Sequence, residues 1–340
     1  MKIILKGYIT HKEAENYSDC ADNYAYSITN HRFAISDGVT KSFFPKIWSR
    51  ILAEKYVALQ GQEDFSIKDC QSEWLQQVTK IATLPDTQWF TQNAFLQGQS
   101  GLATLVTLRF DEKMWYAKAL GDSFLFFIPK GKTNFKDWVY LSSKYSSLKP
   151  EPVIFDSYPD YYSSREEKNG IERGIRGKLE AGRFYLMTDA LSEWFLKEKE
   201  YALKEIETWA NQDVFEQKIT GLRNKGLLNN DDSSILTIDI EDDRKQQLTY
   251  KSVNVQNIDD LNEKKINIVN EETMNTNNDQ LLQKIEEGSV AINKKINRLI
   301  LINVVSTLIF LFLILGLAYA VTKKDSNQNL PKIENSKYAK

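Results

Sequence analysis

The stretch Arg32-Phe33-Ala34-Ile35-Ser36-Asp37-Gly38 decides how this chain is interpreted. Its alternating apolar residues predict a buried strand, which ends abruptly in a carboxylate followed by glycine. A strand that delivers an aspartate to its end is a common way to build a rigid ligand site. Asp-Gly also suits an ordinary turn at a strand exit, which is the alternative interpretation. The ligand-site interpretation gains weight because similar aspartates recur beside other strand-like runs.

The composition of the 340-residue chain narrows the chemistry that such a site can perform. A formal net charge of -2 argues against a nucleic-acid-binding protein with a broad basic face. The two cysteines, Cys20 and Cys70, provide neither a disulfide framework nor a cysteine zinc site. The two histidines, His11 and His31, make a histidine zinc centre and Ser-His-Asp catalysis unattractive. Carboxylates remain as the chemistry-bearing groups, and they prefer hard cations such as magnesium or manganese.

Apolar periodicity predicts a domain of mixed strands and helices over residues 1–241. Runs of strand character predict strands at residues 1–8, 23–28, 32–36, 101–110, 114–120, 124–129, 138–141, 184–188 and 235–240. Apolar residues at helical spacing predict helices at residues 42–60, 68–82, 86–96, 191–198, 204–211 and 214–224. Residues 142–180 are polar and irregular, and a connection of this length is usually functional or mobile.

Four aspartates lie at the beginnings or ends of predicted strands: Asp22, Asp37, Asp189 and Asp231. If those strands are neighbours, the four carboxylates converge at one sheet edge. They cannot all stay ionised there without cations between them. Two divalent metals bridged by a carboxylate and a hydroxide meet this requirement, and such a pair clamps a phosphoryl group for in-line attack. Gly38 lets its backbone approach closely and offer a carbonyl ligand.

Six short motifs carry a resemblance to a known family. In chain order they are Ala-Asp-Asn-Tyr (21–24), Phe-Ala-Ile-Ser-Asp-Gly (33–38), Ser-Gly-Leu-Ala-Thr (100–104), Leu-Gly-Asp-Ser (120–123), Tyr-Leu-Met-Thr-Asp-Ala-Leu (185–191) and Asp-Asp-Ser-Ser-Ile-Leu (231–236). Their order and spacing resemble the metal-dependent protein phosphatase 2C family, most closely its compact bacterial branch. The resemblance implies an α+β fold, a four-layer α-β-β-α sandwich of two antiparallel sheets flanked by helices. It also implies a binuclear manganese or magnesium centre whose metal-bound hydroxide hydrolyses phosphoserine or phosphothreonine.

The resemblance assigns roles to individual residues. Asp37 would bridge both metals, which makes Asp37 and Asp22 the catalytic carboxylates. One metal would be held by Asp22 and the Gly38 carbonyl, and the other by Asp189 and Asp231. Asp122 matches a position that helps to hold a third metal in bacterial relatives, although a strand-end turn is its alternative interpretation. Asp232 stands where the family often has asparagine, so we do not expect it to be a metal ligand.

Departures from the family pattern affect the expected chemistry. Val39-Thr40-Lys41 stand where the family often has His-Gly-Gly, so one candidate general acid is missing. The family's phosphate-binding arginine has no clear counterpart. Either one of the lysines Lys6, Lys12 and Lys41 supplies the positive charge of the missing arginine, or all three are ordinary solvated lysines. Residues 142–180 correspond to a mobile flap, in which three arginines either meet a phosphopeptide or are solvated loop charges: Arg165, Arg173 and Arg176.

The C-terminal hundred residues have a different character. We expect a flexible polar linker over 242–280, because this segment is rich in Asn, Asp, Glu and Lys. Residues 281–298 predict a weak juxtamembrane helix with a candidate self-association seam. Residues 299–321 contain no charge, and at helical rise they exceed the bilayer hydrocarbon thickness of about 30 Å, so we expect a transmembrane helix. A Lys-rich tail follows at 322–340.

These observations together predict a single-pass, membrane-anchored serine/threonine protein phosphatase with a cytoplasmic catalytic domain. Its expected partners are phosphorylated proteins such as a serine/threonine kinase or its targets, and a second copy through the juxtamembrane helix; nucleic acid is not expected. The missing His and Arg motivate an alternative, an inactive or weak phosphatase-like binding module tethered to the membrane. A metal-dependent hydrolase of a small phosphoester is a third interpretation.

Overall fold

The computed structural model describes residues 1–61, 63, 65–148, 153, 155, 159–242 and 248–326. In chain order the strands are β1 (Lys2–Thr10), β2 (Asn23–Ser27), β3 (Arg32–Ser36), β4 (Leu102–Ala103), β5 (Leu105–Phe110), β6 (Met114–Leu120), β7 (Phe124–Pro129), β8 (Val139–Leu141), β9 (Tyr162–Ser163), β10 (Arg173–Lys178), β11 (Gly182–Met187), β12 (Ser233–Glu241) and β13 (Thr249–Val255). The helices are α1 (Pro45–Ala58), α2 (Ile67–Ala82), α3 (Trp89–Leu96), α4 (Asp189–Glu198), α5 (Glu200–Glu207), α6 (Gln212–Asn224) and α7 (Ile258–Ser326), with a 3-10 turn at Phe135–Asp137.

Two main sheets form the centre of the N-terminal unit. We name them sheet A, with strand order β13-β1-β12-β11-β7-β8, and sheet B, with order β10-β6-β5-β3-β2. Apolar side chains on their facing surfaces share one buried core, which includes Leu5 and Phe184 of sheet A and Phe33 and Leu108 of sheet B. Burying both inner faces in this way is the main driving force for stacking two sheets. The expected sandwich of two sheets is therefore confirmed.

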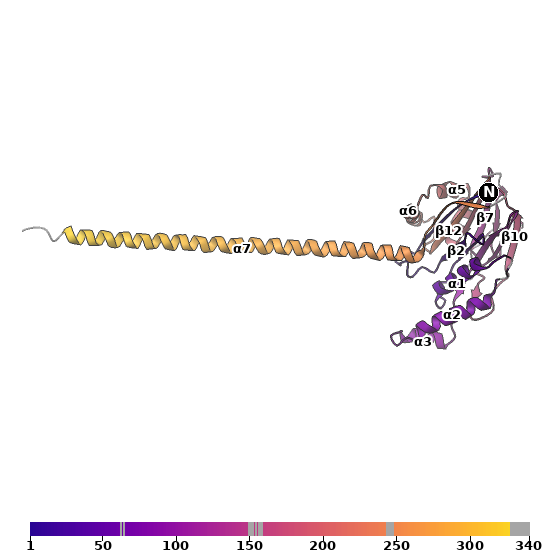
Figure 1. The fold of residues 1–340 in the computed structure, drawn as a ribbon, viewed down its shortest axis with the longest axis horizontal. Helices are drawn as coiled ribbons and strands as arrows, with labels where there is room; N and C mark the ends of the chain where they lie inside the picture. Colours follow the sequence, from indigo (N-terminus) through magenta and orange to yellow (C-terminus); the bar gives the residue numbers. More distant parts are fainter. Residues whose placement is uncertain are drawn as a thin grey trace, which may run out of the picture. The chain divides into compact units, whose positions relative to one another are not determined.

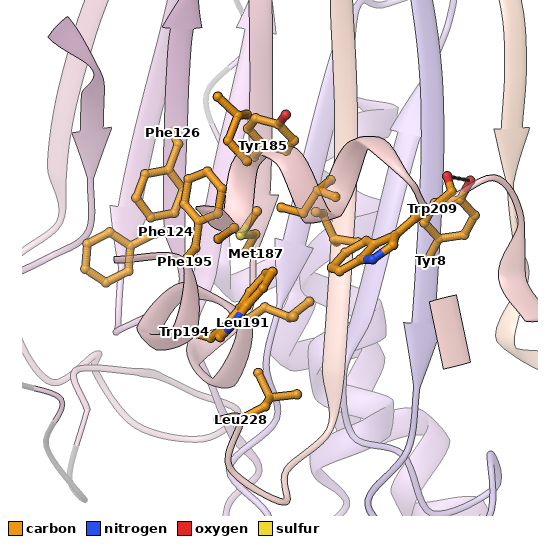
Figure 2. Packing of buried hydrophobic residues seen from close by; sticks show 14 of the residues in the cluster. Tyr8, Phe124, Phe126, Tyr185, Met187, Leu191, Trp194, Phe195, Trp209 and Leu228 are labelled. Carbon is orange, nitrogen blue, oxygen red and sulfur yellow. Dashed lines mark hydrogen bonds between the residues drawn. The ribbon is translucent and has the colours of Figure 1, made fainter. Parts of the chain in front are cut away.

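Helices cover the outer face of each sheet. Helices α4, α5 and α6 pack on sheet A through an aromatic-rich cluster, in which Phe126 and Tyr185 of the sheet contact Phe195 of α4 (Figure 2). The hydroxyl of Tyr8 also donates a hydrogen bond to the Trp209 carbonyl at 3.2 Å. Helices α1 and α2 cover sheet B through a separate core that contains Trp48 and Trp74. The two helical layers lie on opposite sides of the sheets (Figure 1), which gives the expected α-β-β-α order.

Two segments differ from the sequence-based expectation. Residues 142–180, expected to be irregular, contribute β10, which pairs with β6 at the edge of sheet B. The expected linker over 242–280 contains β13, which adds to the edge of sheet A and pairs with β1 in parallel, so sheet A is not purely antiparallel. Both strands have largely exposed, polar faces, and the apolar alternation that reveals buried strands is weak in them. Residues 243–247 of the expected linker lie outside the described residues.

The chain divides into two compact units, Met1–Lys265 and Ile266–Lys340. Helix α7 begins in the first unit, where Ile258 and Leu261 are buried against Ile9, Tyr17 and Cys20. It continues without a break through the expected juxtamembrane and transmembrane segments. Within it, Ile292–Tyr319 is long and apolar enough to cross a membrane by length and composition. Residues 327–340 of the expected Lys-rich tail lie outside the described residues.

Candidate metal and phosphate site

Strand pairing brings the predicted aspartates to one end of the sandwich. Asp22 directly precedes β2 and Asp37 directly follows β3, and these two strands pair with Asn23 opposite Ser36. Asp189 follows β11 and Asp231 precedes β12, which pair with Met187 opposite Ile235. Asp122 lies in the connection by which the chain crosses from β6 to β7, and Phe124 at the start of β7 pairs with Met187. The five predicted carboxylates therefore lie at the same end of the two sheets.

The backbone of Asp37 is fixed by Thr104 between β4 and β5. The Asp37 amide donates to the Thr104 hydroxyl at 3.1 Å, and the Thr104 amide donates to the Asp37 carbonyl at 2.8 Å. The Thr104 hydroxyl also shares a 2.8 Å hydrogen bond with the Ser123 hydroxyl, beside Asp122. Among the described residues, no side chain or backbone group donates to the Asp37 carboxylate. Its position is therefore set by the backbone while its oxygens remain available to a ligand.

Gly38 has no space for a side chain. A Cβ atom there would lie 2.9 Å from the backbone oxygens of Ala21 and of Pro45. This close approach holds the loop after β3 against the residue that precedes Asp22. The requirement for glycine at position 38 is thus steric, whatever the role of its own carbonyl.

Asp22 is a buried carboxylate with one unsatisfied oxygen. Its side chain is only 1% exposed, and its Oδ2 accepts a 2.9 Å hydrogen bond from the Thr188 hydroxyl. Its Oδ1 is buried and has no hydrogen-bond partner within the described part of the chain. An unpartnered buried carboxylate oxygen is costly in free energy, so this atom calls for a proton or a cation.

The remaining carboxylates contact groups of the protein. Asp189 is the first residue of α4, and its Oδ1 accepts a 2.6 Å hydrogen bond from the Ala190 amide. The Oδ1 atom of Asp231 forms a 2.9 Å ion pair with the Nζ of Lys12. The same ammonium group donates to the Thr40 hydroxyl at 2.7 Å, and the Lys12 side chain is only 15% exposed. Among the lysines considered from sequence, Lys12 is thus the one that the structure places at the carboxylates.

Burial and mutual repulsion raise the pKa values of three of these carboxyl groups. For Asp37 the largest cause is burial, followed by the charges of Asp189 and Asp22. Burial and the charge of Asp232 hold the pKa of Asp22 well above its usual range. The pKa of Asp189 is raised by burial and then by Asp122. The cluster therefore binds protons strongly when no cation neutralises it.

The donor set fits hard divalent metals chemically, although the side chains are not arranged around an ion. Among the described residues, no group of three or more His, Cys, Asp or Glu side chains is positioned to hold a metal. Three of the carboxylates instead contact Thr188, Ala190 and Lys12. All available donors are oxygens, as magnesium and manganese prefer, and the Asp22 Oδ1 atom lacks a partner.

Asp232, Thr188 and Thr104 support the site, although none of them is predicted as a metal ligand from sequence. Asp232 accepts hydrogen bonds from the Ala21 amide at 2.8 Å and the Lys12 amide at 3.1 Å, so it joins the two site loops. Thr188 and Thr104 orient Asp22 and Asp37 as described above. Their hydroxyls lie in the quoted motifs, but partners so distant in sequence could be found only from the fold.

The arginines expected in the flap have other surroundings. The Arg165 guanidinium lies over the rings of Trp74 and Phe95, at 5.5 and 5.1 Å from their centroids. It is thus directed at helices α2 and α3. Arg173 and Arg176 are exposed on the edge strand β10.

Comparison with known proteins gives only distant likenesses. No family model matches the sequence, and no curated protein matches it. Solved structures that are similar in fold include a bacterial serine phosphatase (TM-score 0.44, 14% identity, 70% of this chain and 98% of that chain). Another is the serine/threonine phosphatase Stp1 from Staphylococcus aureus, with a TM-score of 0.44 and 14% identity over 70% of this chain and 95% of that chain. A third is PppA, a key regulatory component of T6SS in Pseudomonas aeruginosa, with a TM-score of 0.42 and 14% identity over 70% of this chain and 98% of that chain. Likenesses this distant carry no argument about activity, which must rest on the site itself.

Replacing Asp37 by asparagine should stabilise the metal-free protein at neutral pH, because it removes a buried charge that other aspartates repel. The pKa of Asp37 in the folded state lies above the unfolded value of about 3.9. The destabilisation caused by its buried charge is therefore absent below the unfolded pKa and grows as the pH rises through the folded pKa. The gain over wild type should be small near pH 4 and reach at least about 2 °C in melting temperature near pH 8. Thermal unfolding in EDTA measures it.

Asp86→Asn is the matched control, because it makes the same chemical change at an exposed carboxylate. It should leave the melting temperature unchanged across the pH range. A gain from Asp37→Asn that does not vary with pH, or a loss of stability, would contradict the repulsion argument.

Proposed function

We propose that this chain is a metal-dependent serine/threonine protein phosphatase that is anchored in a membrane. The observation that carries the proposal is the gathering of five aspartates at one end of the sandwich, with a buried Asp22 oxygen that has no partner. Such a cluster is costly in an empty site and favourable around divalent cations. The motif resemblance and the two-sheet fold support the same assignment.

Two manganese or magnesium ions would be held by Asp22, Asp37, the Gly38 carbonyl, Asp189 and Asp231. Asp122 is the candidate for a third ion. When bound, these ions would supply a water nucleophile at neutral pH and neutralise charge on a phosphoryl group. Thr188 and Thr104 would hold Asp22 and Asp37 in place through the hydrogen bonds they already form. Asp232 would keep the Asp22 loop beside Lys12.

Lys12 is the side chain that we assign to the phosphate of the substrate. Its ammonium group lies at the carboxylate cluster and is mostly buried, which strengthens its attraction for an anion. Its contact with Asp231 competes with metal binding at that carboxylate, so Lys12 would turn from Asp231 to the phosphate when the site is loaded. The role is equivalent to that of a basic phosphate anchor, supplied here by lysine.

The substrates that we propose are phosphorylated proteins, with a serine/threonine kinase or its targets at the membrane as candidates. Tethering through one helix would raise the local concentration of the domain near such substrates. The catalytic unit would be cytoplasmic. A second copy of the chain is a candidate partner through residues 281–298.

The central test is phosphate release from a phosphothreonine peptide by the full chain in detergent. We expect release that requires manganese, stops in EDTA and falls at least about 100-fold in Asp37→Asn, since even groups that only support metal ligands cost 10- to 100-fold. Asp86→Asn should retain activity. Manganese binding without phosphate release would favour the tethered binding module instead, and failure to bind manganese would reject the site.

Lys12→Met tests the phosphate anchor. We expect KM for the phosphopeptide to rise about tenfold or more, with a smaller change in kcat, because a charge-assisted contact to the phosphate is lost. Manganese affinity should not weaken, since a positive charge leaves the metal site. Lys41→Met, an exposed neighbour, is the control. An unchanged KM, or a parallel loss of manganese affinity, would contradict the assignment.

The anchor is tested separately from the chemistry. We expect the full chain to sediment with membranes, to remain there in high salt and to be released by detergent, because Ile292–Tyr319 is apolar over a bilayer-spanning length. A chain that ends at residue 265 should be found in the soluble fraction. Recovery of the full chain in a detergent-free supernatant would refute the anchor.

A further inference from the structure

A second site lies on the outer face of sheet B, away from the carboxylates. It is a cavity of about 670 Å³ between the sheet and helix α1. Its charged and aromatic lining includes Arg32, Tyr56, Arg109, Tyr116 and Lys118. Arg32 begins β3 and Asp37 follows the end of this strand, so at about 3.3 Å per residue the Cα atoms of Arg32 and Asp37 are about 17 Å apart. The proposed phosphatase chemistry makes no use of this cavity.

Two arginines face each other directly across the sheet at the cavity. In the pairing of β3 with β5, Arg32 is the register partner of Arg109. Side chains at such positions point to the same face and begin about 5 Å apart, and like charges placed in this way destabilise a sheet. Arg32 is also only 4% exposed, so its charge is largely removed from water. A pair of this kind needs a compensating anion.

The hydrogen-bond and ring partners of this pair are neutral within the described part of the chain, while the charge of Arg109 also acts on the nearby Asp111 carboxylate. Both guanidinium groups donate to the carbonyl oxygen of Gly61, at 3.0 Å from Arg32 and 3.2 Å from Arg109. Arg32 also stacks on Tyr56, and Arg109 on Tyr116, with 5.0 and 4.6 Å to the ring centroids. The Nε atom of Arg32 is buried without a hydrogen-bond partner. N–H groups of the two guanidinium ions therefore remain available to a ligand.

Three acidic residues also line the cavity, Glu63, Glu167 and Glu172, of which Glu63 and Glu172 already accept hydrogen bonds. Glu172 forms an ion pair with Lys118 at 3.0 Å and accepts a hydrogen bond from the Tyr162 hydroxyl. The lining also has an apolar part, which includes Leu59, Phe65, Ile67 and Leu105. The cavity thus combines a cationic end, rich in free donors, with an apolar slot bordered by aromatic rings.

We propose that this cavity binds a small phosphomonoester that carries a planar ring, a compound of mononucleotide size. Two guanidinium forks suit a phosphate dianion, which has three terminal oxygens to accept their remaining N–H groups. The apolar slot suits the ring, and the cavity volume lies within the range of small-molecule sites. The proposal concerns binding alone and does not depend on the phosphatase activity.

The test is isothermal titration calorimetry of the full chain in detergent and EDTA, so that the metal-free chain cannot hydrolyse the probe. Adenosine monophosphate is the probe, with adenosine and inorganic phosphate as its two halves. We expect the nucleotide to bind at least about tenfold more tightly than either half, because both ends of the cavity contribute. No heat with the nucleotide at millimolar concentration would overturn the proposal, as would equal binding of inorganic phosphate.

Variants locate the binding. Arg109→Gln, at the less buried member of the pair, should weaken nucleotide binding at least about tenfold by removing charge-assisted hydrogen bonds. Arg50→Gln makes the same change on α1 outside this cavity and should bind as wild type. Asp37→Asn should also bind as wild type, which separates this cavity from the carboxylate cluster. Nucleotide binding that is unchanged in Arg109→Gln, in a variant with the wild-type circular dichroism spectrum, would refute the site.

Discussion

Repulsion among Asp22, Asp37 and Asp189 is the constraint that the N-terminal unit must overcome. Burial raises the pKa of each carboxyl group, and each is raised further by another aspartate. If the rest of the fold were only weakly stable, the strands would separate at their ends and reduce the repulsion among these carboxylates. The surrounding structure holds the strands together, so the cluster persists as a preorganised binding site for cations.

Stabilisation comes from three large apolar cores that lie along the sheets rather than at the site. The cores inside the sandwich and on its two outer faces contain many fully buried aromatic side chains, including Trp48, Trp74, Trp194 and Trp209. Each large side chain buried in this way contributes roughly 2–3 kcal/mol. The polar end of the sandwich can therefore be poorly satisfied without loss of the fold, and stability and site chemistry occupy different parts of the same strands.

The sequence predicts those parts of the fold in which one physical signal dominates. Strands such as Phe124–Pro129 are buried and strongly apolar, and their continuous apolar run alone locates them. The aspartates at strand ends are predicted because an apolar run of sequence stops or starts beside each one. By contrast, β13 is a polar edge strand whose register is set by β1 and not by its own pattern. Asp231 and Asp232 are adjacent aspartates with different contacts. The Asp231 carboxylate forms an ion pair with the Lys12 ammonium group, whereas the Asp232 carboxylate accepts hydrogen bonds from backbone amides. Only the fold shows this difference. The arginine pair at the second cavity depends on strand register in the same way, since Arg32 and Arg109 are remote in sequence.

The first turns of α7 belong to the N-terminal unit and complete one of its apolar cores. Ile258 and Leu261 share a small core with Tyr17 and Cys20, and the Lys265 ammonium lies 4.8 Å from the centroid of the Tyr17 ring. Lys12 and Asp22 flank Tyr17 and Cys20 in the chain. Removing the chain from Ile258 onward would therefore uncover apolar surface on the segment between Lys12 and Asp22, so the start of α7 is part of the fold that carries the site.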